Sequence, residues 1–364
     1  MNDFAVGGVQ KLAVDQLNNL KNDFNFVLVV LMQSSRGDFY NLIDKDIPVY
    51  KLNFKGFYDF KSLFKLIKIF IKEKPVIVKT AMFFSNTIVR LLKPFFGFTI
   101  ITAEHNTETK RPFLHKFLNR IFSKITYTIV ADSKTVADHV SKIEKIPIKK
   151  FTVIYNGVEL EEIKKAKELF LSQRESIRAE INVSKDEPMF LTVARLVIQK
   201  NHELMISSFA KYISEGGEGK LVIIGDGILM EKLKKLAVDC GVKKDIIFLG
   251  ERQDIYKYYV ASDFFLLTSV REGFCISAMN GLAFGLPLIS TRVAGVVEYL
   301  KDGINGYFVD DNKESIAITL KQITSLSDDK LKEMKLKAEI TAKDFSVESH
   351  VQKYKEIYKT ILEN

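Results

Sequence analysis

Residues 190–200 read FLTVARLVIQK, and their pattern indicates the fold class. The first residues are apolar and end near Val193, as in a strand buried on both faces, and Arg195 and Lys200 follow in a turn and a helix start. The same order recurs through the second half, where we expect strands at 189–193, 220–224, 246–249, 264–267 and 287–290. Short apolar strands that alternate with helical stretches predict an α/β fold, a parallel sheet with helices on both faces.

The first half of the chain repeats this alternation. Strands are expected at 26–32, 49–54, 75–78, 99–103, 127–131 and 151–155, and amphipathic helices at 9–20 and 59–74. A length of 364 residues suits two doubly wound domains that face a central cleft. We expect an N-terminal Rossmann-like domain over 1–160, a C-terminal one over 161–345, and a helix over 346–364 that can cross back to the first. The charged, helical segment 159–185 is interpreted as the linker.

The beginning of the chain departs from this pattern. Val6-Gly7-Gly8-Val9 reads as a glycine turn that leads into a helix, and such a turn normally follows a strand. Only Met1–Ala5 precede it. We therefore expect that the first strand of this domain is either very short or absent because the true start lies upstream of Met1.

Composition excludes several classes of protein. Hydrophobic residues make up 47% and charged residues 27%, which describes a folded α/β protein without disordered tracts. Cys240 and Cys275 form no CxxC pair and the five histidines show no metal-ligand spacing, so we expect no dedicated zinc site. No secretory signal opens the chain and no apolar run reaches about 18 residues, which favours a cytoplasmic protein.

Two short motifs follow strands of the second half. Arg195 and Lys200 can hold a diphosphate, since arginine binds it bidentately and lysine acts as a point charge. Gly225-Asp226-Gly227 ends a strand in a glycine turn, which lets the backbone approach a ligand closely. Taken alone, the first motif can equally be surface cations and the second an ordinary turn between strand and helix.

A third motif lies between the strand at 264–267 and a helix that ends near Gly285. It reads Ser269-Val-Arg-Glu272-Gly273-Phe274-Cys275-Ile276. Backbone N–H groups at a helix start can bind a phosphate or a sugar hydroxyl, and Glu272 just ahead of them can accept hydrogen bonds from sugar hydroxyls. Its place between strand and helix makes this turn a candidate binding site.

As an ordered series, these motifs resemble family 4 of the retaining glycosyltransferases, which have the GT-B architecture of two facing Rossmann-like domains. The C-terminal series is Arg195…Lys200, Gly225-Asp226-Gly227, Phe248-Leu249-Gly250, Ala261-Ser262-Asp263, Ser269, Glu272-Gly273-Phe274, Gly285-Leu286-Pro287 and Gly295…Glu298. The N-terminal half adds Gly7-Gly8, the segment Glu104-His105-Asn106, Ala131-Asp132-Ser133 and Tyr155-Asn156-Gly157-Val158. The resemblance covers nearly the whole chain.

The resemblance implies a role for each matching residue. Arg195 and Lys200 would hold the donor diphosphate and stabilise its charge as it leaves, Glu272 would contact the transferred sugar, and His105 would hydrogen-bond the sugar or the reacting centre. The implied donor-binding residues are Gly8, Gly227, Gly273, Phe274, Cys275, Ile276 and Asn280. A UDP- or GDP-sugar would be the substrate, with neither cofactor nor metal required. The leaving phosphate is thought to act as base for same-face attack, so no side-chain nucleophile is assigned. His105 can alternatively be a buried structural histidine.

Asn280 departs from the family pattern. The family places a second glutamate eight residues after the first, where it grips the ribose hydroxyls, and this chain has Asn280 there. Neutral hydrogen bonds contribute about 0.5–1.5 kcal/mol and charged ones about 1.5–3 kcal/mol. We therefore expect donor binding to be weaker by roughly tenfold, which leaves the nucleotide and the catalytic competence open.

Positive charge is concentrated in one part of the chain. The net charge is +9, yet residues 51–124 hold 15 Lys or Arg against 4 Asp or Glu. Such a patch suits a polyanionic partner, namely anionic lipid, a phosphate-bearing acceptor or nucleic acid, or else it is a solvated lysine surface. No nucleic-acid-binding motif accompanies this patch, so we expect that the protein does not bind nucleic acid. Helices at 59–74 and 113–124 carry much of this charge beside apolar faces, which either rest on an anionic membrane surface or pack on the sheet.

Three hypotheses remain open at this point. The first is a bacterial hexosyl- or N-acetylhexosaminyltransferase that extends a lipid-linked or saccharide acceptor during surface polysaccharide synthesis, such as capsule or lipopolysaccharide, as a cytoplasmic or peripheral inner-membrane protein. The second is a non-catalytic glycosyltransferase-like scaffold, suggested by Asn280 and the missing strand. The third, ranked lowest, is a sugar-nucleotide epimerase, which would need catalytic carboxylates and histidines of which only His105 stands out.

Overall fold

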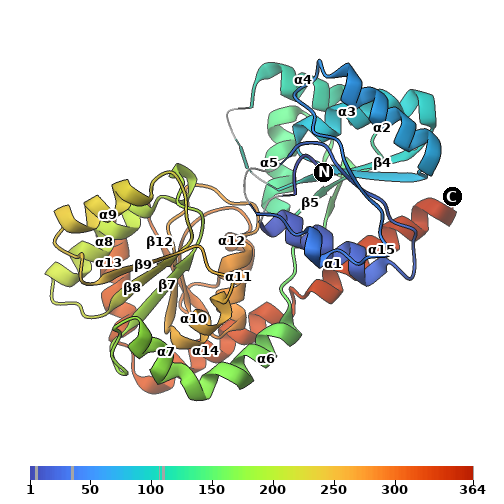
Figure 1. The fold of residues 1–364 in the computed structure, drawn as a ribbon. Coiled ribbons are helices and arrows are strands. Elements are labelled where there is room, and N and C mark those ends of the chain that lie inside the picture. Colours follow the sequence, from blue (N-terminus) through green and yellow to red (C-terminus); the bar gives the residue numbers. More distant parts are fainter. Residues whose placement is uncertain (5–6, 34–36, 106, 109–110, 364) are drawn as a thin grey trace. The chain divides into compact units, whose positions relative to one another are not determined.

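The computed structural model describes residues 1–4, 7–33, 37–105, 107–108 and 111–363. The chain divides into two compact units (Figure 1). The first comprises Met1–Gly157 together with Val347–Asn364, and the second comprises Val158–Ser346. Each unit has its own parallel sheet and its own hydrophobic core, so both are Rossmann-like domains, as the alternation of strands and helices predicts.

The first unit is built on parallel strands. Its four-stranded sheet runs in the order β3 (Ile77–Ala81), β4 (Thr99–Glu104), β5 (Thr128–Ala131), β6 (Phe151–Val153). A separate parallel pair consists of β1 (Leu28–Val30) and β2 (Val49–Lys51). Because the four strands are parallel neighbours, the residues that follow them gather at one edge of the sheet.

Helices cover this sheet. They are α1 (Gly8–Leu20), α2 (Phe60–Glu73), α3 (Phe83–Phe96), α4 (Phe113–Phe122), α5 (Lys134–Glu144) and α15 (Val347–Glu363), with 3-10 turns at Tyr40–Leu42 and Ile148–Lys150. Local chemistry sets their starts: the Asp59 side chain accepts from the Ser62 N–H ahead of α2, and the Ser133 hydroxyl accepts from Val136 ahead of α5. The last helix, α15, packs on α1 within this unit.

The second unit contains a six-stranded parallel sheet in the order β12-β11-β10-β7-β8-β9. The strands are β7 (Met189–Val193), β8 (Lys220–Ile224), β9 (Ile246–Gly250), β10 (Phe264–Leu267), β11 (Leu288–Thr291) and β12 (Gly306–Val309). The chain builds outward from β7 to β9 and then returns to the other side of β7 with β10. The order therefore reverses between β7 and β10, where doubly wound sheets bind their ligands.

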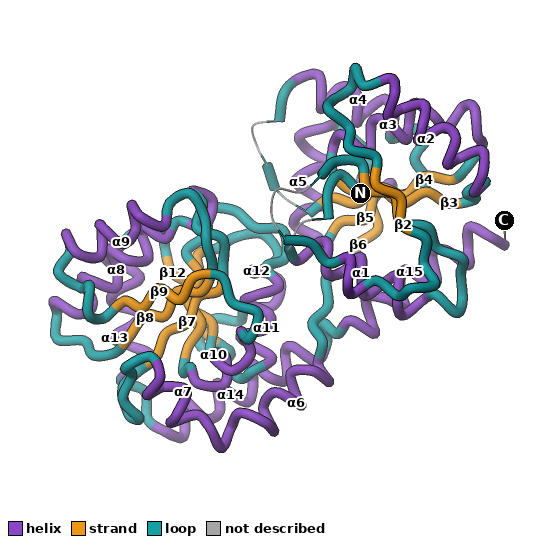
Figure 2. The backbone as a smooth tube through the Cα atoms, in the orientation of Figure 1, coloured by secondary structure: helices purple, strands orange, loops and turns teal. Residues whose placement is uncertain are grey.

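Helices lie on both sides of this sheet (Figure 2). They are α6 (Leu160–Phe170), α7 (Arg174–Glu180), α8 (His202–Ser214), α9 (Met230–Asp239), α10 (Ile255–Ala261), α11 (Ile276–Ala283), α12 (Val296–Tyr299), α13 (Lys313–Thr324) and α14 (Asp328–Lys343), with 3-10 turns at Leu171–Gln173 and Ile198–Lys200. The α8 and α13 pair and the α11 and α14 pair make extensive contacts. Phe190, Phe209 and Ile223 bury their side chains in the core between sheet and helices.

The interpretation of residues 159–185 as a linker is wrong. Helices α6 and α7 belong to the second unit and pack against α10. Ile163 and Ile177 are buried, and Arg178 donates to the Ala261 carbonyl at 2.8 Å and pairs with Asp263 at 3.2 Å. The charge and helical pattern of this segment led to the linker interpretation, but its Arg178 is buried and makes its contacts inside the domain.

The first residues lie beside β1. The Met1 ammonium donates to the Val29 carbonyl at 2.7 Å, and the carbonyls of Met1 and Asn2 accept from Leu31 at 3.0 Å and Met32 at 2.6 Å. These contacts resemble strand pairing, although no strand is assigned ahead of α1 within the described residues. Val6 of the predicted glycine turn lies outside the described residues, and the short or absent first strand stays a prediction.

Candidate functional site

Two loops of the second unit meet at the point where its strand order reverses. Strands β7 and β10 are direct parallel neighbours, with Phe190 opposite Phe264. Arg195 and Lys200 follow β7, and Glu272 follows β10. The carboxyl ends of adjacent parallel strands lie at one edge, so these side chains come from a single edge of one sheet.

Lys200 and Glu272 form a buried ion pair at this edge. Lys200 Nζ lies 2.6 Å from Glu272 Oε1, and the Ser269 hydroxyl donates to the same oxygen at 2.6 Å. Burial is the largest influence on the pKa of Lys200 and acts to lower it, but the charge and hydrogen bond of the Glu272 carboxylate act against burial, and the pKa is raised from its usual value. Lys200 is therefore fully charged at neutral pH, and the Glu272 carboxylate is shared between a cation and a hydroxyl.

Arg195 is the exposed cation of the site. Its side chain is exposed, and its charge is close enough to Lys200 to act against protonation of that lysine. Arg195 and Lys200 repel each other, and this repulsion is relieved when an anion binds between or beside them. The pair is therefore suited to a diphosphate, and the binding of one there stays a prediction.

Hydrogen bonds fasten the two loops to each other. The Val270 N–H donates to the Gln199 carbonyl at 2.9 Å, and the Gln199 side chain donates to the Arg271 carbonyl at 2.9 Å. The Thr268 hydroxyl donates to the Asn201 carbonyl at 3.0 Å. The positions of Lys200 and Glu272 are thus set by backbone contacts between the loops and do not depend on their own ion pair alone.

Gly225 and Gly227 are required by a close approach of backbones. A Cβ at Gly225 would lie 2.0 Å from the Ala194 carbonyl oxygen, and one at Gly227 would lie 2.4 Å from the Leu196 carbonyl oxygen. The glycine turn after β8 therefore packs directly on the segment that carries Arg195. This packing explains both glycines, and a contact of Gly227 with a ligand remains a prediction.

The turn from Gly273 to Ile276 is held under backbone strain. Cys275 precedes α11 with a φ of 63°, a left-handed conformation that non-glycine residues rarely adopt. Phe274 is buried and its carbonyl accepts from the Tyr299 hydroxyl at 2.9 Å. Burial raises the pKa of the Cys275 thiol to about 11, so this sulfur is neutral at physiological pH.

Asn280 lies one turn into α11, on the same short helix that this turn begins. Its side chain is half-buried and lies near Tyr259, whose hydroxyl donates to the Ser277 carbonyl at 3.0 Å. The expected contact of Asn280 with a ribose is not tested by the structure.

Polar residues follow three neighbouring strands of the first unit. His105, Asp132 and Asn156 come after β4, β5 and β6. Asp132 Oδ2 lies 3.5 Å from His105 Nδ1 and 3.5 Å from Asn156 Nδ2, while its Oδ1 has no hydrogen-bond partner among the described residues. Asp132 is 3% exposed, and this burial raises the pKa of its carboxyl.

The predicted residues are divided between the two units. Gly8, which begins α1, and His105 belong to the first unit, and the other predicted residues belong to the second. Asn106 of the predicted histidine segment lies outside the described residues. His105 is partly exposed, so the alternative of a fully buried structural histidine is not what the structure shows.

Sequence reasoning missed three residues near these positions. Asp132 and Asn156 were part of matched segments but were given no role, and only the sheet order brings them to His105. His202 begins α8 directly behind Lys200, is 1% exposed, and has no partner for either ring nitrogen in the described part of the chain. Burial, followed by the charge of Lys200, lowers its pKa to about 4, so its ring is neutral at pH 7.

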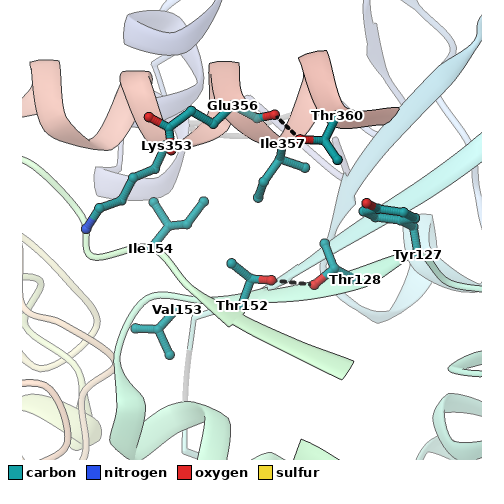
Figure 3. Close-up of a pocket in the computed structure, with 9 residues that line it drawn as sticks. All are labelled: Tyr127, Thr128, Thr152, Val153, Ile154, Lys353, Glu356, Ile357 and Thr360. Carbon is teal, nitrogen blue, oxygen red and sulfur yellow. Dashed lines mark hydrogen bonds between the residues drawn. The ribbon is translucent and has the colours of Figure 1, made fainter. Parts of the chain in front are cut away.

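Among the described residues there is no group of three or more His, Cys, Asp or Glu side chains that could hold a metal ion, and none of the described helices is long and apolar enough to span a bilayer. Figure 3 shows a cavity of about 270 Å³ between the edge strand β6 and α15, lined by Thr128, Thr152 and Ile357 among others. It contains none of the predicted site residues.

Comparison with known proteins gives two family matches that together span most of the chain. Residues 6–162 match the family described as Glycosyltransferase Family 4, and residues 173–342 match the family described as Glycosyl transferases group 1. The boundary between the matches falls close to the start of the second unit. Each half of the chain thus has its own independent match.

Individual relatives agree with the family matches. An uncharacterized glycosyltransferase of Methanocaldococcus jannaschii is 35% identical over 202 residues, which cover 54% of this chain and only half of that protein's length. The UDP-Gal:alpha-D-GlcNAc-diphosphoundecaprenol alpha-1,3-galactosyltransferase of Escherichia coli is 26% identical over 97% of this chain and 94% of its own. The solved structure of Anabaena HepE in complex with UDP-glucose superimposes with a TM-score of 0.85 at 16% identity, covering 99% of this chain and 98% of that one, which shows the GT-B fold.

Proposed function

This chain belongs to the family 4 glycosyltransferases, and we propose that it transfers a sugar, with retention, from a nucleoside-diphosphate sugar to a lipid-linked or saccharide hydroxyl in bacterial surface glycan synthesis. The proposal rests on the charged residues at one edge of the sheet of the second unit. Arg195, Lys200 and Glu272 stand there at the carboxyl ends of β7 and β10, where doubly wound sheets bind nucleotides.

The proposed chemistry assigns one task to each charged group. The bond between the anomeric carbon and the diphosphate oxygen breaks, the diphosphate keeps the electron pair, and the acceptor oxygen bonds to the same carbon. The acceptor proton passes to the departing phosphate oxygen. Arg195 and Lys200 stabilise the negative charge that develops on the diphosphate, and such preorganised charges are often the largest contribution to catalysis.

Glu272 suits the position of a sugar-hydroxyl acceptor better than that of a nucleophile. Its Oε1 accepts from Lys200 and Ser269, which lowers its availability for attack but fixes its orientation. A carboxylate held in this way can accept hydrogen bonds from sugar hydroxyls without competing for the anomeric carbon. Lys200 would therefore serve both the carboxylate and the diphosphate.

The acceptor is proposed to be carried on a lipid at the inner face of the membrane. The E. coli relative is named for a diphosphoundecaprenol acceptor. The basic segment 51–124, with 15 Lys or Arg against 4 Asp or Glu, suits an anionic surface or a phosphate-bearing acceptor. The donor sugar is proposed to be a hexose or an N-acetylhexosamine, selected by loop residues around Glu272.

Thermal unfolding in the presence of candidate donors tests this function. UDP-, GDP- and ADP-sugars are each added to the full chain, and a donor that binds only the folded protein raises the midpoint. The expected result is a rise with one nucleotide series, together with slow release of that nucleoside diphosphate by hydrolysis. If no nucleotide sugar shifts the midpoint or is hydrolysed, the proposal is wrong.

Asn280 favours a second candidate, a non-catalytic relative that acts as a scaffold. On the enzyme hypothesis Asn280→Glu strengthens donor binding by roughly tenfold, because a carboxylate replaces a neutral acceptor, while wild type already turns over. On the scaffold hypothesis wild type is inactive and the substitution is what first creates binding. Steady-state turnover of both proteins with the donor found above separates the two.

A further inference from the structure

Helix α4 turns a polar residue inward and apolar residues outward. Asn119 is the residue that it buries, at 5% exposure, and its side chain accepts from Arg90 Nη1 at 2.7 Å and donates to Glu144 Oε1 at 3.0 Å. Phe113, by contrast, is 80% exposed. The other exposed apolar residues of this helix are Leu114, Phe117 and Ile121. Leu118 and Phe122 are half-buried, so only a small part of the expected apolar face packs inward and the larger part of it is exposed.

Helix α2 has two apolar faces, one buried in the core of the first unit and one exposed. Leu66, Ile69 and Phe70 are buried in the core of the first unit. A second apolar stripe is exposed, with Phe60 at 72%, and it continues through Phe64 and Ile71. Lys61, Lys65, Lys68 and Lys72 recur at steps of four, three and four. Residues three and four apart share a helix face, so a lysine stripe runs parallel to the exposed apolar stripe.

Lysines also surround a hollow at the start of α2. Lys51, Lys55, Lys61 and Lys65 line an open space of about 580 Å³. Asp59 lies in it too, but its carboxylate accepts from the backbone N–H groups of Lys55 and Ser62 and so is occupied in capping the helix. A space with several ammonium groups and an occupied carboxylate is suited to a phosphate-bearing headgroup.

Two aromatic contacts, one edge-to-face and one stacked, connect the start of α2 with α4 through α3. The ring of Phe57, just before α2, lies 6.2 Å from that of Phe83 at the start of α3, and Phe83 stacks on His115 of α4 with centroids 3.5 Å apart. Helices α3 and α4 are in direct contact. The starts of α2 and α3 and the helix α4 are thus neighbours in the first unit, where Figure 1 draws the three helices close together.

We propose that this surface, made of the exposed residues of α2 and α4 with the lysine hollow, docks on an anionic lipid bilayer. Helices that lie in a membrane interface place aromatic and aliphatic residues at the acyl boundary and lysines at the headgroups, which is the arrangement of both stripes. A second copy is a poor occupant, because a symmetric contact would press this basic patch against itself. The docking surface deepens the lipid-borne acceptor of the proposed function by naming the face that meets the membrane.

A tryptophan probe tests the docking directly, since the chain contains no tryptophan. Phe113→Trp places a single fluorophore on α4, and Leu336→Trp, an exposed position on α14 of the second unit, is the matched control. Each full-length protein is mixed with vesicles of phosphatidylglycerol or phosphatidylcholine, without nucleotide sugar. We expect the emission of the α4 probe alone to shift to the blue, and only with the anionic vesicles.

Charge reversal supplies the second measurement. Lys61→Glu combined with Lys65→Glu is expected to reduce partition into phosphatidylglycerol vesicles at least tenfold, whereas Lys243→Glu with Lys244→Glu, exposed in the second unit, leaves it unchanged. Circular dichroism confirms that each variant is folded, and the tryptophan probe stands alone if one is not. The proposal is overturned if neither vesicle shifts the α4 probe, if both do so equally, or if the shift grows with protein concentration alone. None of these outcomes bears on nucleotide-sugar hydrolysis, which is measured separately.

Discussion

At the scale of single residues, Asp132 is a buried carboxyl group of the first unit whose hydrogen bonds are incomplete within the described residues. Its Oδ1 is buried without a partner among the described residues, and its Oδ2 is 3.5 Å from both His105 and Asn156, which is long for a hydrogen bond. Buried polar groups are normally paired, and unpaired ones recur at functional sites. We infer that Asp132 is a positioning residue that orients His105 and whose contacts tighten when substrate is bound.

Asp132→Asn should lower kcat by roughly tenfold to a hundredfold, because a charged hydrogen bond is worth about 1.5–3 kcal/mol. Nucleotide affinity should be unchanged, since the diphosphate residues belong to the other unit. The pH profile of kcat should also shift, which a purely structural loss would not produce. Asp138→Asn, exposed on α5 of the same unit, is the control. An unaltered kcat and pH profile would show that Asp132 does not act through His105.

The sequence was most informative for residues that act beside their own strand. Arg195 and Lys200 follow β7 in the chain, so an apolar run and the order of motifs in the family were enough to predict a site there. Asp132 and His202 were missed for a physical reason. Asp132 lies near His105 only because β4 pairs with β5. His202 stands out only because it is buried close to Lys200. Neither strand pairing nor burial can be predicted from a local sequence pattern.

At the scale of elements, the C-terminal helix α15 is attached by a chain of polar groups. His350 Nδ1 lies 2.7 Å from the Tyr155 carbonyl, and its Nε2 lies 2.7 Å from the Gln16 amide nitrogen of α1. The Gln16 oxygen in turn accepts from Lys79 of β3. A carbonyl can only accept, so the neutral ring donates through Nδ1 and accepts through Nε2. Protonation of Nε2 would put two donors face to face.

The hydrogen bonds of His350 predict that the folded protein loses stability in acid. Burial lowers the pKa of His350 from 6.5 to about 3. Between these values the unfolded chain binds more protons than the folded one, so the free energy of unfolding falls as pH drops from 6.5 to 3, by about 1.4 kcal/mol per pH unit. Urea unfolding across this range should show the slope in wild type and a flatter one in His350→Gln. Equal slopes would mean that another group is responsible.

The sequence pattern predicted most strands but did not predict the orientation of every helix. Most strands were found because buried parallel strands are continuous apolar runs, but the edge strand β12 was missed, since Gly306–Val309 is short and half-buried. The pattern of α4 was found, but its orientation was predicted only as one of two alternatives. Periodicity shows that a helix has an apolar face, whereas the buried Asn119 network decides which face is turned inward.

At the scale of the whole molecule, charge and chemistry are divided between the two units. The basic segment 51–124 lies in the first unit, whereas Arg195, Lys200 and Glu272 lie in the second. The proposed membrane attachment and the proposed donor binding therefore belong to different units, and we expect that each can be removed separately. Variants of the α2 lysines should leave hydrolysis of a soluble donor unchanged, and variants of Lys200 should leave vesicle binding unchanged.

Calorimetric titration of the full chain with UDP and with GDP tests the central claim, that the β7–β10 edge of the second unit binds the donor diphosphate. The account predicts that one of the two binds and that Lys200→Gln weakens it at least tenfold, because one charged contact of about 1.5–3 kcal/mol is lost. Lys232→Gln, exposed on α9 of the same unit, should bind as wild type does. Equal affinity in wild type and Lys200→Gln, or no binding of either nucleotide, would contradict the account.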